Sequence, residues 1–236
     1  MRKRLWLKIV VGVVALGVVV TVAVPFVYIH FIKDDAPPTV AKQGLPTRTS
    51  EHPTDPATGG AETYALTMSD DVTKNYVGYR VVEVLFGQDT EAVGRTTSVT
   101  GSLTINGAQI TAAEFTVDMA TLKSDRDIRD SKFKGQIMQT STFPTATFAL
   151  TRPIDLGSVP ADGTEITASA TGDLTLHGVT KSITLEVKAQ RNGDIIDVLG
   201  STKVAFADYN IDNPSNGGVT TQDNGTIEFL LSFTKS

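Results

Sequence analysis

The sequence contains no cysteine, and this absence excludes several kinds of bond and site. The chain can form no disulfide, no zinc–thiolate centre, no thiol nucleophile and no lipid-modified N-terminal cysteine. A domain outside the cytoplasm would therefore have to be held together by burial of its core alone. A domain of roughly 170 residues is large enough to meet that requirement.

Histidine is also scarce, with only His30, His52 and His177 in the chain. Because they lie in very different segments, we expect neither a metal site nor a catalytic triad. We expect His177 to be a turn residue with a local hydrogen bond. A glycine-rich phosphate loop, a Gly-x-Ser-x-Gly elbow and a His-Glu-x-x-His motif are absent as well. We therefore predict no catalytic residue, no cofactor and no enzyme activity; a hydrolase or isomerase is the least favoured alternative.

Outside the N-terminus, basic residues are outnumbered by acidic ones. Residues 1–33 carry five basic residues and no acidic one, whereas the whole chain carries 21 basic and 26 acidic residues. The rest of the chain therefore has a net charge of −10. Such an acidic domain is not expected to bind nucleic acid.

A basic segment, residues 1–8, precedes 24 residues without charge, residues 9–32. As a helix this run would span roughly 36 Å, enough to cross a hydrocarbon core of about 30 Å. The basic residues before it and Asp34 and Asp35 after it predict a cytoplasmic N-terminus, by the positive-inside rule. We therefore predict a single-pass anchor in the cytoplasmic membrane, with the C-terminal domain outside the cytoplasm. A cleaved signal peptide is the alternative, but the run is long and lacks a clear cleavage site.

Residues 33–61 have the composition of a linker. They hold five of the ten prolines, mixed with Thr, Ser and Gly, and cannot bury a core. We expect a disordered segment that as a loose coil reaches roughly 30 Å. The following domain, residues 62–236, would stand clear of the membrane but remain near it.

That domain shows alternation of apolar and polar residues, which is typical of strands with one buried face. Apolar rows of period two occupy residues 99–105, 113–119, 166–176, 183–189 and 227–233. Turn dipeptides such as Asn106-Gly107 and Asn192-Gly193 separate them. The pattern predicts an all-β domain, an antiparallel barrel of about eight strands, with one short helix within residues 120–138.

Three segments carry a resemblance to a known family. Residues 172–187 read Gly-Asp-Leu-Thr-Leu-His-Gly-Val-Thr-Lys-Ser-Ile-Thr-Leu-Glu-Val, and upstream lie an Arg/Asp-rich segment, residues 124–133, and Thr-Phe-Pro-Thr-Ala-Thr-Phe at residues 142–148. In this order they resemble the YceI-like family, over about residues 62–233. The resemblance implies an elongated lipocalin-like barrel, and some family members hold a long isoprenoid chain inside it. Tyr64 stands where the family often has tryptophan, and the ligand's identity does not transfer.

Apolar side chains in these rows are the candidate ligand contacts. They would line a slot if the barrel is hollow, and would pack on one another if it is filled, and the sequence leaves both open. The candidates are Leu103, Phe115, Val117, Phe133, Phe143, Phe148, Leu174 and Leu176. Arg126 and Arg129 are candidates for binding an anionic head group at the barrel mouth, because guanidinium matches phosphate geometry. The alternative is a solvated charged segment.

The sequence as a whole favours a membrane-anchored binding protein outside the cytoplasm, whose barrel holds an isoprenoid or another lipid. The alternative is an interaction module of the cell envelope, with a filled barrel and no small-molecule ligand. The ligand's identity, the oligomeric state and any protein partner are not determined by the sequence.

Overall fold

The computed structural model describes residues 36–48, 60–85 and 87–236. The predicted anchor at residues 9–32 lies outside these residues. Among the residues described, no helix is long and apolar enough to cross a membrane.

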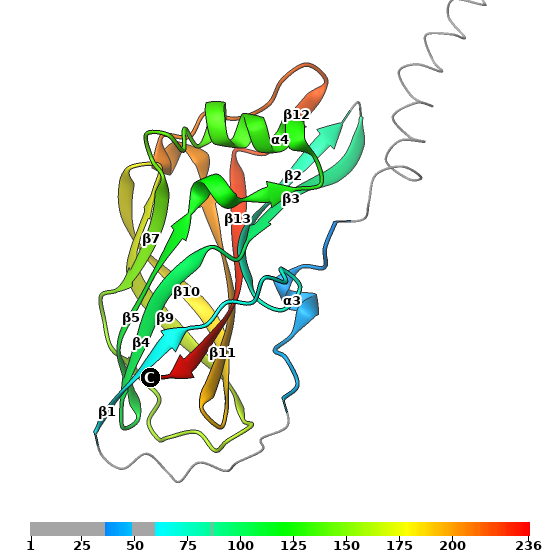
Figure 1. Ribbon diagram of the computed structural model, residues 1–236. Coiled ribbons are helices and arrows are strands. Elements are labelled where there is room, and N and C mark those ends of the chain that lie inside the picture. The colour runs from blue at the N-terminus through cyan, green and yellow to red at the C-terminus, as the bar shows by residue number, and fades with distance from the viewer. Residues whose placement is uncertain (1–35, 49–59, 86) are drawn as a thin grey trace, which may run out of the picture.

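Eight antiparallel strands form a closed ring (Figure 1). In the order of their pairing they are β1 (Ala61–Leu66), β4 (Val99–Asn106), β5 (Gln109–Asp118), β7 (Thr145–Leu150), β9 (Glu165–Leu176), β10 (Val179–Asn192), β11 (Ile195–Ala205) and β13 (Asn224–Lys235). The ring closes where β1 pairs with β13, at Tyr64–Lys235, Ala65–Thr234 and Leu66–Phe233. The predicted all-β antiparallel barrel is therefore confirmed.

The alternating apolar and polar residues of each strand lie on the inner and outer faces of the barrel wall. On β9, Ala170, Leu174 and Leu176 are buried inside, while Ser169, next to Ala170, is exposed. The strand turns directly into β10 through two residues, His177 and Gly178, whose φ values are 49° and 75°. Positive φ at both positions gives the turn the twist that a tight hairpin needs.

A second hairpin flares from one end of the ring. It consists of β2 (Tyr76–Leu85) and β3 (Gln88–Thr96), and β13 pairs with β2 through residues 226–230, beyond its short pairing with β1. We call the end with the β2–β3 tip the upper end, as in Figure 1. The lower end carries the β4–β5 and β10–β11 turns. The same edge of β13 therefore pairs with two strands, because β1 is too short to pair along its whole length.

The upper end is covered by the segment between β5 and β7. It contains η3 (Met119–Thr121), β6 (Lys123–Ser124), the α-helix α4 (Asp127–Lys132) and a π-helical turn, η4 (Phe133–Ile137). The helix α4 is the short helix predicted within residues 120–138. The remaining short elements are β8 (Ile154–Asp155), η5 (Phe206–Tyr209) and β12 (Val219–Thr221).

Residues 36–48, which we call the strap, pack on the outside of the barrel, where the sequence predicted a disordered linker. The strap contains one helical turn, α3 (Val40–Gln43). Val40 is buried against Tyr76, Leu199 and Leu230. The expected disorder was wrong for residues 36–48. The strap has too few apolar side chains to show the periodic pattern of a helix or strand, so its packing could not be recognised from the sequence.

Polar groups on the outer wall also hold the strap. Arg48 donates hydrogen bonds to the fully buried Asp197, with Nε to Oδ2 at 2.6 Å and Nη2 to Oδ1 at 2.9 Å. Ser232 donates a further one to Asp197 at 2.6 Å. A buried carboxylate is costly unless it is paired and hydrogen-bonded. The strap therefore supplies a partner that the barrel wall needs.

Candidate functional site

The barrel encloses two apolar cavities, one above the other. The lower one has a volume of about 160 Å³ and lies among Leu103, Ala113, Phe148, Leu185 and Phe229. The upper one has a volume of about 190 Å³ and lies beneath the segment that carries η4. It is lined by Tyr79, Val117, Phe133, Leu176 and Phe206, among others. Each could hold on the order of ten water molecules, but offers them few hydrogen-bond partners.

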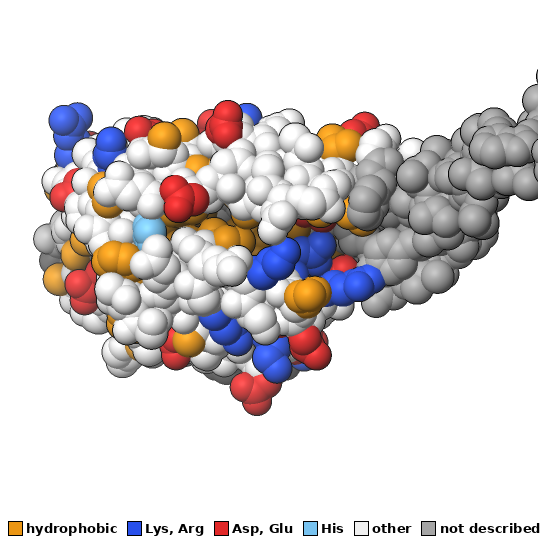
Figure 2. All heavy atoms as spheres, turned by 90° about the horizontal axis from the view of Figure 1, so that it is seen from above, with side chains coloured by type: hydrophobic (Ala, Val, Ile, Leu, Met, Phe, Trp, Pro, Cys, Tyr) orange, Lys and Arg blue, Asp and Glu red, His pale blue; other side chains and the backbone are white. Residues whose placement is uncertain are grey.

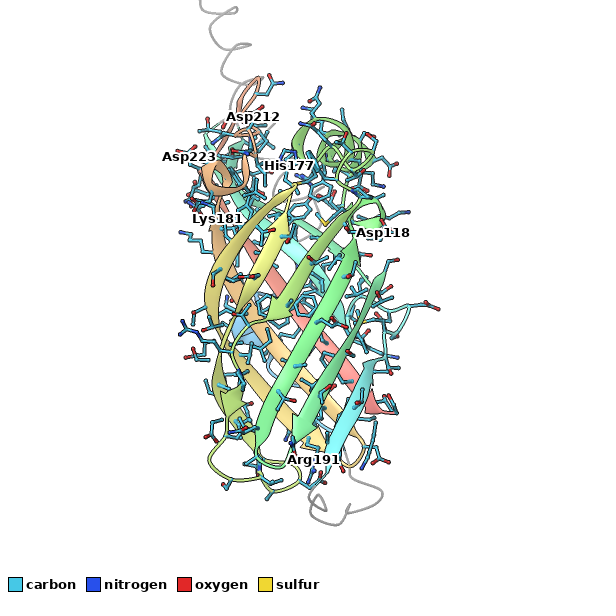
Figure 3. The ribbon with its side chains drawn as sticks, turned by 90° about the vertical axis from the view of Figure 1, so that its left-hand side faces the viewer. Asp118, His177, Lys181, Arg191, Asp212 and Asp223 are labelled. Atoms are coloured by element: carbon cyan, nitrogen blue, oxygen red, sulfur yellow. The ribbon has the colours of Figure 1, made fainter. Side chains whose placement is uncertain are left out.

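The two cavities adjoin halfway along the barrel. Val77, Phe115, Leu174 and Ile227 line both of them. Figure 3 shows the long axis of the barrel, with His177 near its upper end and Arg191 near its lower end. The unfilled volume is therefore distributed along the axis, a shape that suits a long narrow ligand.

Aromatic rings lie near the middle of this space, where Phe115 lines both cavities. The Phe115 ring stacks on Phe148, with centroids 5.3 Å apart, and is tilted against Phe229 at 6.1 Å. Phe229 lies opposite Gly200, where a Cβ would come within 2.5 Å of the ring. A Cβ on Gly172 would collide with the Phe148 ring in the same way. A glycine in a strand often marks such a close approach, and here it lets the rings lie against the wall.

Seven of the eight predicted cavity residues line the cavities. Leu103 and Phe148 line the lower one, Phe115 and Leu174 line both, and the rest line the upper one. That last group is Val117, Phe133 and Leu176.

Phe143 does not line either cavity. Its ring packs edge-on against His177, with centroids 4.5 Å apart, and fits over Gly178. His177 is a turn residue as predicted, but its hydrogen bond is not local. Its Nδ1 lies 3.1 Å from the carbonyl oxygen of Tyr209, so this nitrogen donates the bond. The pair ties the β9–β10 turn to the short helix η5.

The two arginines proposed for a head group are placed differently. Arg129 lines the upper cavity, where its Nη2 lies 3.1 Å from Oε1 of Glu83, and it also pairs with Asp125. Arg126 is exposed at the start of α4 and does not line the cavity. An anionic head group at Arg129 would therefore have to compete with two carboxylates.

Sequence reasoning missed Tyr79, which lines the upper cavity beside Arg129. Its ring stacks on Phe133, with centroids 4.8 Å apart. Burial raises the pKa of the Tyr79 phenol well above its usual range, so the hydroxyl stays protonated. The sequence did carry a signal for this position. Val77, Tyr79 and Val81 are every second residue of β2, so alternation places all three side chains on its inward face. The phenol is a hydrogen-bond donor in a largely apolar space, near Glu83 and Arg129.

A polar cluster was also missed at the lower end. The Tyr64 hydroxyl donates to Glu62 at 2.9 Å, and both residues line the lower cavity together with Arg191. Burial and the bond to Glu62 raise the pKa of Tyr64 to about 12. Among the described residues, no group of three His, Asp or Glu side chains could hold a metal ion.

The sequence is similar to a known protein family and to several bacterial proteins. The model of the YceI-like domain family matches residues 71–233. A UPF0312 protein from Vibrio vulnificus is 33% identical over 131 residues, which cover 50% of this chain and 64% of that protein. Protein YceI of Escherichia coli O157:H7 is 37% identical over 97 residues, covering 41% and 44%. The chain thus spans less than two thirds of the length of these relatives.

Two solved structures share the fold. A polyisoprenoid-binding domain from Saccharophagus degradans, implicated in plant cell wall breakdown, superposes with a TM-score of 0.59 at 19% identity. The match covers 73% of this chain and 98% of that one. BcnA of Burkholderia cenocepacia gives 0.52 at 21% identity, covering 70% and 99%. At these identities the likeness concerns the fold alone.

Proposed function

The chain belongs to the YceI-like domain family, and on that basis we propose that its barrel binds an isoprenoid or another long apolar lipid, without acting as an enzyme. The observation that carries the proposal is the pair of adjoining apolar cavities along the barrel axis. The polyisoprenoid-binding domain from Saccharophagus degradans, which has the same fold, supports the choice of ligand class. The alternative of a filled barrel with no ligand is disfavoured by the unfilled volume.

The binding energy would come from burial of the hydrocarbon chain. Each methylene transferred from water to an apolar site contributes about 0.8 kcal/mol. The cavity walls offer water few hydrogen bonds, so little solvation is lost when a hydrocarbon enters. Because the rings of Phe115, Phe148 and Phe229 lie around the middle of the barrel, they are proposed to contact the chain between the two cavities.

The polar end of the ligand is proposed to lie in the upper cavity. Tyr79, Glu83 and Arg129 are polar residues that line it, together with Thr147, Thr221 and Thr226. Of the two arginines, Arg129 is the candidate for direct contact, and the Tyr79 phenol is a further donor. Such a polar rim above an apolar slot is the usual way in which a pocket fixes the orientation of an amphipathic ligand.

The location of the protein belongs to the proposal as well. The uncharged residues 9–32, preceded by a basic segment, support a single-pass anchor in the cytoplasmic membrane with the barrel outside the cytoplasm. The anchor would keep the barrel near a source of lipid, and reversible burial would let it take up and release one chain at a time.

Two neighbouring alanines on β5 allow a matched test. Ala113 lines the lower cavity, whereas Ala112 is exposed outside. We expect Ala113→Phe to block the slot and to lower the affinity for geranylgeraniol by at least about tenfold, a loss of about 1.4 kcal/mol. The affinity is measured by displacement of the neutral fluorescent probe N-phenyl-1-naphthylamine.

Ala112→Phe adds the same ring outside the barrel and should leave the affinity unchanged. Equal affinity for both variants, with both folded by circular dichroism, would show that the alcohol does not enter the lower cavity.

A further inference from the structure

The strap is fastened to the barrel wall close to its first described residue. The carbonyl oxygen of Pro37 accepts a hydrogen bond of 2.7 Å from Arg80 Nη2, and that of Pro38 accepts one of 3.3 Å from Arg95 Nη2. Both arginines are buried, and Glu228 lies between them, 2.8 Å from Arg80 Nε and 4.0 Å from Arg95 Nη2. Because leaving such groups without partners is costly, these contacts hold the beginning of the strap in place.

This attachment shortens the connection to the N-terminal apolar run. Only residues 33–36 lie between the end of that run and Pro37. Fully extended, this connection spans no more than about 18 Å. If residues 9–32 are the membrane anchor, as proposed above, the part of the wall at Arg80 lies within that distance of the bilayer surface. If residues 33–61 were a free linker, the barrel could lie at a much larger range of distances from the bilayer.

The upper end, next to this attachment, carries exposed apolar side chains. Ile128 on α4 is 66% exposed, the largest exposure among the large apolar residues described, and Val82 on β2 is 40% exposed. Their chain neighbours Arg129 and Glu83 form an ion pair at 3.1 Å, which joins α4 to β2 at this end. The ion pair therefore brings the segments that carry these two exposed side chains close together at the upper end.

The segment that covers the upper end is locally basic, while Asp118, Asp212 and Asp223 lie elsewhere at this end (Figure 3). Residues 123–134 carry five basic and three acidic side chains, in a part of the chain whose net charge is otherwise strongly negative. Figure 2 looks down on the upper end, and shows Lys and Arg side chains gathered along one side of it beside an exposed apolar side chain. Asp125 is paired with Arg129, and Asp130 accepts hydrogen bonds from the backbone and hydroxyl of Ser124. Basic side chains around an apolar residue suit a surface with anionic lipid head groups.

We propose that the barrel rests on the bilayer through this upper end, with Ile128 and Val82 at the lipid interface and the strap fixing the orientation. The proposal deepens the function proposed above and rests on its membrane anchor. The upper cavity lies directly beneath, lined by Phe133, Ile137 and Met138 from the covering segment. A lipid could therefore pass between the bilayer and the cavity with little exposure to water.

Single cysteines can test this orientation, because the chain has none of its own. The full chain is reconstituted in nanodiscs of phosphatidylcholine and phosphatidylglycerol at a ratio of about 3:1. An NBD fluorophore is attached at Ile128→Cys or, as the control for the lower end, at Asn106→Cys, the exposed last residue of β4. Doxyl-labelled lipids should quench the fluorophore at position 128 at least about threefold more than that at 106.

The role of the strap is tested with two further substitutions. Val40→Asp places a charge in the buried contact between the strap and the barrel, while Ala41→Asp places it on the exposed side of the same helical turn. Val40→Asp should remove the difference in quenching between positions 128 and 106, and Ala41→Asp should preserve it.

Equal quenching at both positions, in nanodiscs that retain the protein, would overturn the orientation but leave the lipid-binding barrel intact. Failure of the full chain to remain with the nanodiscs would instead overturn the anchor and the orientation that rests on it, whereas lipid binding in the barrel is tested separately by Ala113→Phe.

Discussion

Pairs of glycine and an aromatic residue on neighbouring strands determine how open the barrel is. Gly200 faces Phe229, and Gly94 faces Tyr79, in directly opposite positions. In both pairs a Cβ on the glycine would collide with the ring. Because the glycine has no side chain, the aromatic ring on the neighbouring strand can lie along the wall. Large aromatic residues can therefore line the cavities without filling them.

Substitution of Gly200 tests this relation. Gly200→Ala should push the Phe229 ring toward the lumen and lower the free energy of unfolding by about 1–3 kcal/mol, the usual cost of overpacking. The free energy is measured by urea denaturation. Gly135→Ala, at a position with no neighbouring atom within 4 Å of the added Cβ, is the control and should not destabilise the protein.

The double variant Gly200→Ala/Phe229→Leu should regain part of the loss, because the smaller side chain makes room for the new methyl group. If Gly200→Ala is as stable as the original protein, the close approach does not govern the packing of Phe229.

At the residue scale, period-two alternation predicted the cavity lining well. The inward phase of each strand identifies Leu103, Phe115 and Leu174 without knowledge of the fold. Alternation could not place Phe143, because it precedes β7, which begins at Thr145, and so belongs to no alternating row. Tyr209, the partner of His177, and Glu83, one partner of Arg129, come from distant segments, and no local pattern reveals them.

Among the elements, the pairing of β1 with β13 is the seam that closes the barrel. It has only three registered pairs, and side chains reinforce it. Lys235 Nζ lies 2.7 Å from Oε1 of Glu62, and the Thr67 hydroxyl donates to that of Thr234 at 3.0 Å. The seam therefore depends partly on a charge pair at its end.

The seam makes stability depend on pH. The Lys235 ammonium and the Tyr64 hydroxyl hold the pKa of the Glu62 carboxyl below its usual range. The folded state thus favours the charged form, so this contribution is present above the ordinary pKa of about 4.3 and is lost as the pH falls through the lowered value. At pH 7, Glu62→Gln should lower the free energy of unfolding by about 0.5 kcal/mol, since the pair is partly exposed.

Urea denaturation at several pH values measures this difference, which should shrink as the pH falls below about 4. Glu114→Gln, on the exposed side of β5, is the control and should show no such change. A difference for Glu62→Gln that is constant from pH 7 to low pH would mean that its charge does not stabilise the seam.

The strap shows where element prediction from sequence reaches its limit. Arg80, Asp197 and Glu228 occupy outward positions of their strands, which alternation identifies as solvent-exposed. They are buried because the strap and each other cover them. Since a single strand pattern cannot reveal that a distant segment will pack on its outer face, the linker prediction extended too far.

At the scale of the whole molecule, the sequence predicted an antiparallel barrel with a short helix because every wall strand keeps one apolar face. It could not predict whether the interior is filled. That depends on where each ring lies relative to the glycines of neighbouring strands, and therefore on register, which the pattern alone does not determine. The two adjoining cavities are the property on which the proposed function depends.

Native mass spectrometry of the full chain, purified in mild detergent, tests that function most directly. A lipid-binding barrel should give a folded species that carries about one long apolar molecule per chain, released on activation and identifiable in the extracted lipid. A spectrum that shows only the mass of the protein, before and after incubation with geranylgeraniol, would contradict the account.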